Sequence, residues 1–157
     1  MKNRFREAKV MSELIKRQFE LSRGSIFKDI ESASGENFDV KPEGFNNTIH
    51  WQIGHVLTTT EQLVFGSEGQ LPEEYGKFFG NGSKLSDWQG EVPSVDTIVE
   101  QLKAQLVRIK EIPNERFEEI LPKPFLGNTT YGELVGFTAF HETNHSGQIH
   151  AMVRVLG

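Results

Sequence analysis

The sequence predicts an all-α fold, a four-helix bundle formed by a single domain of residues 1–157. Four segments carry apolar residues at spacings of three and four, which is typical of helices that bury one face. No segment shows the clear alternation of apolar and polar residues that marks a half-buried strand, and no internal repeat is visible. The connections between the segments are long, and they permit a crossover topology.

The first two helices are defined by their apolar residues and by the loop between them. The first is expected over residues 5–30, and residues 32–46 read as a loop because they are rich in Gly, Ser, Asn and Pro. Asn47 or Thr48 can cap the second helix, which is expected to run to Gly66. The apolar stripe of the first helix consists of Met11, Leu14, Ile15, Phe19, Ile26 and Ile30.

A glycine-rich segment, residues 67–93, separates the second and third helices. It also contains Tyr75, Phe78, Phe79 and Trp88, so it is too aromatic for a free linker. We expect it to be irregular and to pack against the bundle as a lid or a cross-connection.

The third helix is expected over residues 95–112, with Ser94 as its cap and Pro113 at its end. One short helical turn is expected within residues 114–128.

Composition excludes several classes of function. The net charge is -5 and the pI is about 5.6, which gives no basic surface for nucleic acid. There is no cysteine, so disulfides, thiolate metal ligands and a protein-borne thiol nucleophile are excluded. The charged N-terminus lacks an apolar signal region, and no window approaches 18 uninterrupted apolar residues. We expect a soluble, cytoplasmic protein that acts on neither membranes nor nucleic acid.

The last helix, residues 131–156, begins after a capping box formed by Thr130 and Glu133. It carries His141 and His145, which lie 40° apart in the middle of its apolar stripe at 100° per residue. Residues four apart on a helix are close enough for both imidazoles to reach one metal ion.

The spacing H-E-x-x-H in HETNHSGQIH also occurs in zinc peptidases, which need a third ligand further along the chain. Only twelve residues follow His145, none of them acidic. Gly147 and His150 each lie one position too early for the longer form of that signature. His150 also points away from His141, so we expect it at the surface or in a second layer around the site. The peptidase interpretation is therefore disfavoured.

A third ligand is available in the second helix, which offers His50 and His55. The two differ by about 140° around the axis, so only one of them can serve. His55 is favoured because it lies well inside the helix, whereas His50 is in the first turn and nearer to solvent. The apolar stripe of this helix is centred to one side of His55, so spacing alone leaves it a candidate.

Two motifs together resemble the DinB/YfiT-like family: NTIHWQIGHV from Asn47 and HETNHSGQI from His141. The similarity extends through LPEEYGKFFGNGSKLSDW and PSVDTIVEQL, and so over most of the chain. It implies an up-down-down-up bundle, frequently a homodimer, with a divalent ion, often zinc or nickel, between the second and fourth helices. By position, it implies His55, His141 and His145 as the metal ligands.

The resemblance does not imply one activity. Some relatives transfer low-molecular-weight thiols such as bacillithiol to electrophilic acceptors, and others isomerise small acids with a thiol cofactor. Three neutral imidazoles leave a coordination position open for water or a thiolate. Because this chain has no cysteine, any reacting sulfur must come from a soluble thiol.

Three further residues are candidates for the site. Gln148 lies on the stripe of His145 and is expected to orient a ligand, although a helix–helix hydrogen bond is the alternative. Glu142 is expected to act as a base or to support a metal ligand, with a solvated helix flank as the alternative. Trp51 is a candidate wall of the ligand pocket, and an ordinary core position is the alternative.

We expect a metal-dependent transferase that joins a soluble thiol to electrophilic small molecules in stress or detoxification. A metal-dependent hydrolase of small substrates would share the site but need no thiol. A non-catalytic, stress-related metal-binding protein is the third possibility.

Overall fold

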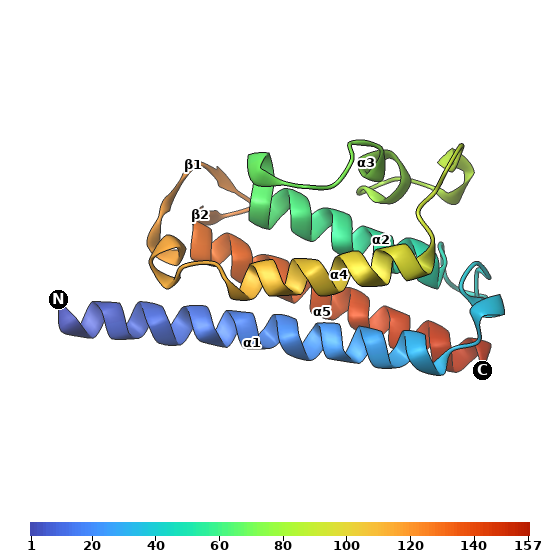
Figure 1. Ribbon diagram of the computed structural model, residues 1–157, viewed down its shortest axis with the longest axis horizontal. Coiled ribbons are helices and arrows are strands. Elements are labelled where there is room, and N and C mark those ends of the chain that lie inside the picture. Colours follow the sequence, from blue (N-terminus) through green and yellow to red (C-terminus); the bar gives the residue numbers. More distant parts are fainter.

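A computed structural model describes all 157 residues and has the predicted bundle of four long helices (Figure 1). The helices α1 and α5 run in one direction along the bundle, and α2 and α4 run in the other (Figure 1). This is the expected up-down-down-up order. None of the helices combines the length and apolar character that crossing a bilayer requires. The bounds are α1 Lys2–Ser32, α2 Ile49–Thr60, α4 Val95–Lys110 and α5 Tyr131–Leu156.

The helices begin where the capping residues predict. Thr48, Ser94 and Thr130 each accept a hydrogen bond from the backbone N–H three residues further on, at 3.1 Å in all three cases. The carboxylate of Glu133 also accepts from the N–H of Thr130 at 3.2 Å, which completes the predicted capping box. Local side-chain chemistry therefore sets the start of α2, α4 and α5.

The second helix changes geometry before it ends. α2 ends at Thr60, and a wider π-helical turn, Glu61–Phe65, continues the chain to Gly66. Gly66 has a φ of 51°, in the left-handed region where a glycine is not strained. The predicted helix to Gly66 is thus continuous, but its last turn is not α-helical.

The segment between α2 and α4 packs on the bundle as a cross-connection. It includes one short helix, α3 Glu74–Phe79, which the sequence did not predict. Tyr75, Phe78 and Phe79 are buried in the same apolar cluster as α2. Figure 1 shows α3 on the opposite side of α2 from α5, so the segment covers the face of α2 that points away from α5.

A small hairpin connects α4 to α5, and the sequence did not predict it. After the predicted short turn, which is the 3₁₀ turn Asn114–Glu118, β1 Ile120–Phe125 pairs antiparallel with β2 Asn128–Thr130. The β1 sequence ILPKPF contains two prolines and is mostly exposed. It therefore lacks the apolar alternation from which a strand is recognised.

The core consists of two apolar clusters, one toward each end of the bundle. One holds Phe19, Ile109 and Val135, and the other holds Ile26, Leu102 and Ile149. Between these positions, the long helices and the π-helical turn contribute buried polar groups to a layer across the middle of the bundle. That layer contains Ser22, Arg23, Leu57 through its carbonyl, Glu61, Gln105 and Glu142.

Candidate metal centre

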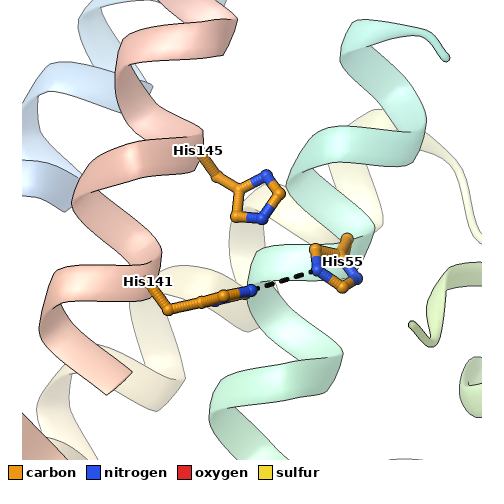
Figure 2. Close-up of side chains that lie close together, drawn as sticks. All are labelled: His55, His141 and His145. Carbon is orange, nitrogen blue, oxygen red and sulfur yellow. Dashed lines mark hydrogen bonds between the residues drawn. The ribbon is translucent and has the colours of Figure 1, made fainter. Parts of the chain in front are cut away.

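Three histidines from two helices meet at one point, as the sequence predicts. His55 comes from α2, and His141 and His145 come from α5; Figure 2 shows their rings turned toward one another. Each offers one ring nitrogen, and these nitrogens all lie within 4.8 Å of one another. The Nε2 atoms of His55 and His141 are 3.3 Å apart. Two nitrogens bound tetrahedrally to one zinc ion would be about 3.3–3.4 Å apart, so this pair already has that spacing, and the group of three could hold an ion.

The two histidines of α5 lie at the edge of its buried face. Glu142, Ser146 and Ile149 are the buried residues at the centre of that face, whereas His141 and His145 are only half-buried. The expectation that both histidines sit mid-stripe is therefore wrong. Their position at the edge suits an open ligand site, because a catalytic ion needs one accessible coordination position.

The orientation of α2 could not be inferred from periodicity, because nearly all of the helix is buried. Of its residues, only Thr59 is partly exposed. His50 is also buried, contrary to expectation, and its ring nitrogens contact Asp39 Oδ1 at 2.8 Å and the Pro93 carbonyl at 2.7 Å. Both nitrogens of His50 are thus engaged elsewhere, which leaves His55 to face α5.

The His55 ring is held from two sides. Its Nδ1 lies 2.7 Å from the carbonyl oxygen of Phe79, so Nδ1 carries the proton and donates it. The Trp51 ring stacks on it at a centroid distance of 4.6 Å and an angle of 11°. Trp51 is itself buried, and its Nε1 donates to Ser83 Oγ at 3.0 Å. The tryptophan is therefore part of the core and directly adjacent to the site.

The His145 ring is held by a residue that the sequence analysis missed. Its Nδ1 lies 2.6 Å from Oε1 of Gln52, a buried side chain of α2. Gln52 also donates to Gln148 Oε1 at 3.0 Å. Gln148 thus makes the helix–helix hydrogen bond that was its alternative role, while its expected role toward a ligand stays a prediction. The sequence signal for this role was a glutamine between apolar neighbours in this helix, because a buried amide needs hydrogen-bond partners.

A model of the DinB superfamily matches residues 18–149, well over half of the chain. This chain belongs to the DinB superfamily. The match spans both motifs that suggested the relationship, and with them all three histidines. No curated protein matches the chain at a significant level.

Glu142 in this DinB protein is directed at α1. It is completely buried, so the solvated-flank alternative is wrong. One carboxylate oxygen accepts from Ser22 Oγ at 2.5 Å and the other from Arg23 Nε at 2.9 Å, both on α1. The ligand atoms that lie within 4.8 Å of one another include no carboxylate oxygen. The structure therefore does not bring Glu142 to the histidine site.

His150, in contrast, is exposed on the DinB surface. Its Nδ1 contacts Asp29 Oδ1 at 2.9 Å, and its ring does not join the other three. This agrees with the surface position expected from its angle on the helix.

Burial keeps the three histidines of the DinB site neutral. Desolvation, with the neighbouring His55, lowers the pKa of His141 to about 4. Desolvation, with His55 and His141, lowers the pKa of His145 to about 3. The pKa of His55 is also lowered by burial, although its hydrogen bond to Phe79 opposes that shift. Neutral imidazole is the form that binds metal, so the site is prepared for an ion at neutral pH.

Proposed function

We propose that this DinB protein binds zinc or nickel through His55, His141 and His145 and transfers a soluble thiol to electrophilic small molecules. The observation that carries the proposal is the convergence of three neutral imidazoles, and no other ligand, on one point. Such a set leaves a coordination position open for a substrate. A divalent ion bound there would stabilise the deprotonated, nucleophilic form of a thiol at neutral pH.

The sulfur must come from outside the chain, since the protein has no cysteine. A low-molecular-weight thiol of the bacillithiol type suits this role because it is small and is kept reduced in the cytoplasm. We therefore place the reaction in the cytoplasm, as a defence against reactive compounds under stress.

The location of Glu142 favours thiol transfer over hydrolysis. A metal-dependent hydrolase commonly uses a nearby carboxylate as the base that activates water, as the glutamate of H-E-x-x-H does in zinc peptidases. Here that carboxylate is engaged by Arg23 and Ser22 on α1. A thiol loses its proton far more readily than water, and so it depends less on such a base.

In the transfer step, the sulfur lone pair forms a bond to the electrophilic carbon as the bond to the leaving group breaks. The leaving group takes the bonding electrons, and the thiol proton is released to solvent. With an epoxide, the ring C–O bond breaks and the oxygen takes up a proton. Around this reaction, Phe79 and Gln52 hold the His55 and His145 rings, and Trp51 covers the back of His55.

The proposal is tested by turnover of a chlorodinitrobenzene or an epoxide with bacillithiol, cysteine or glutathione. Protein loaded with zinc or nickel is compared with protein stripped by a chelator. We expect turnover that requires both the metal and a thiol, and that is lost in His145→Ala. A metal-dependent rate that ignores added thiol would favour the hydrolase. Silence with every metal and thiol, together with tight metal binding, would favour a non-catalytic metal-binding protein.

We further propose that a second copy of the chain covers the exposed face formed by α1 and α5. Between these helices runs a groove of about 700 Å³ that no Asp, Glu, Lys or Arg lines. Leu21 and Phe140 line it and are 58% and 69% exposed, beside small residues such as Ser25 and Gly147. A patch with both protruding and small residues can pair with itself about a twofold axis, which is the commonest symmetry of homodimers.

A further inference from the structure

Gln52 makes three hydrogen bonds that use its whole amide group. Its Oε1 accepts from Nδ1 of His145, and its Nε2 donates to Asn47 Oδ1 at 2.9 Å and to Gln148 Oε1 at 3.0 Å. The side chain is 1% exposed, so water cannot replace these partners. A buried amide that lost them would leave polar groups unpaired away from water, which destabilises the fold.

The two acceptors agree with the way the Gln52 amide points in the structure. If its oxygen and nitrogen were exchanged, the oxygen would face the side-chain oxygens of Asn47 and Gln148. The NH₂ group would then face His145. In the observed orientation the oxygen faces His145, and an oxygen can only accept, so the proton of this ring must be on Nδ1. The lone pair of His145 is thereby left on Nε2, the nitrogen on the side of the other two histidines.

The three histidines are not supported equally. His55 donates Nδ1–H to a backbone carbonyl, which no side-chain substitution at that position can remove. Nδ1 of His141 is buried and has no hydrogen-bond partner. His145 is therefore the one histidine of the three whose tautomer is set by another side chain.

We infer that Gln52 is a positioning residue of the metal centre. This inference rests on the metal site of the proposed function. Gln52 holds His145 in the Nδ1-protonated tautomer with Nε2 directed at the ion, and Asn47 and Gln148 keep the Gln52 amide in the orientation that does so. Partners of this kind raise metal affinity by about 10–100-fold, because the ring is already oriented and protonated on the correct nitrogen.

The inference is tested in two measurements on Gln52→Leu and Gln52→Glu. The first is nitrogen NMR of the imidazole rings in metal-free protein, which reports the tautomer of each histidine. The second is the dissociation constant for zinc, measured by competition with a chromogenic chelator. Gln52→Leu should shift His145 toward the Nε2-protonated tautomer and weaken zinc binding by about 10–100-fold. Gln52→Glu keeps an acceptor for the Nδ1–H of His145 and should keep the tautomer, while it loses the two hydrogen bonds to Asn47 and Gln148.

Gln105→Leu is the matched control, since Gln105 is also a buried glutamine with three hydrogen bonds that connect helices. It should lower the midpoint of thermal unfolding but leave the His145 tautomer and the zinc affinity unchanged. An unchanged His145 tautomer in Gln52→Leu would overturn the inference, as would equal losses of affinity in Gln52→Leu and Gln105→Leu. If Gln52→Leu does not fold, Gln52→Glu decides the question. Loss of the Nδ1-protonated tautomer of His145 in Gln52→Glu would also overturn the inference.

The two proposals fail in different ways. A wild-type protein that binds neither zinc nor nickel would refute the proposed function. The tautomer measurement needs no metal, so it would still decide whether Gln52 orients His145.

Discussion

The histidines of this chain differ in the contacts of the ring nitrogen Nδ1. His55 and His145 each use Nδ1 for a protein acceptor and keep Nε2 for the shared point, whereas His150 is exposed and paired with Asp29. We expect His145→Ala to weaken zinc binding by more than about 100-fold, because losing a ligand costs more than losing a ligand's partner. His150→Ala is the control and should bind zinc like the wild type. Elemental analysis and chelator competition measure both, and equal affinities would contradict the assignment.

The lowered pKa values of the histidines predict how stability depends on pH. His141 and His145 have pKa values of about 4 and about 3 in the folded protein, against 6.5 for an ordinary histidine. Below pH 6.5 the unfolded chain therefore binds protons that the folded chain does not, and stability must fall as the pH falls. We expect the free energy of unfolding of metal-free protein, measured in urea, to decrease from pH 6.5 toward pH 4. The change of this free energy with pH should be smaller in His145→Ala. An identical change in the wild type and the variant would refute the attribution to His145.

At the scale of the helices, Gly54 lets α2 and α3 approach closely. A Cβ atom built at Gly54 would lie 2.3–2.5 Å from the ring of Phe79, which is on α3, so this ring must shift. Since the Phe79 carbonyl accepts from His55, we expect Gly54→Ala to destabilise the fold by about 1–3 kcal/mol and to weaken zinc binding as well. Urea unfolding and chelator competition measure the two effects.

Gly24 in α1 provides the matched control for Gly54. A Cβ atom there would meet nothing within 4 Å, so Gly24→Ala should stabilise the helix by about 0.5–1 kcal/mol and leave zinc binding unchanged. Equal effects of the two substitutions would show that the close approach at Gly54 is unimportant.

The elements that the sequence predicted well are those whose signals are local. The caps at Thr48, Ser94 and Thr130 and the i, i+4 spacing of His141 and His145 depend only on neighbouring residues. The side of α2 that turns toward α5 was not predictable, because a helix buried on all sides has no single apolar stripe. The role of Gln52 was missed because its partners His145 and Gln148 lie more than 90 positions away in the sequence. The hairpin was missed because β1 is exposed and contains proline.

Across the whole molecule, a layer of buried polar groups joins the four long helices. Arg23 and Glu142 are both fully buried, 2.9 Å apart, and Arg23 also donates to Gln105 on α4. Removing one partner of such a pair leaves a charge buried without compensation. We therefore expect Glu142→Gln to lower the free energy of unfolding by about 3–5 kcal/mol while zinc binding per folded molecule is kept. Loss of zinc binding or of turnover in a stably folded Glu142→Gln would instead support the catalytic role first expected for this residue.

Formation of the proposed dimer depends on the exposed face formed by α1 and α5. If a second copy covers the groove, Phe140 and Leu21 are buried in the dimer, and a charge there would oppose association. We expect the wild type to elute as a dimer in size-exclusion chromatography with light scattering, and Phe140→Asp to elute as a monomer. Val107→Asp is the control, because Val107 is 55% exposed on α4 and outside the groove. That variant should remain a dimer. A monomeric wild type, or a Phe140→Asp dimer, would show that this face is not the contact between copies.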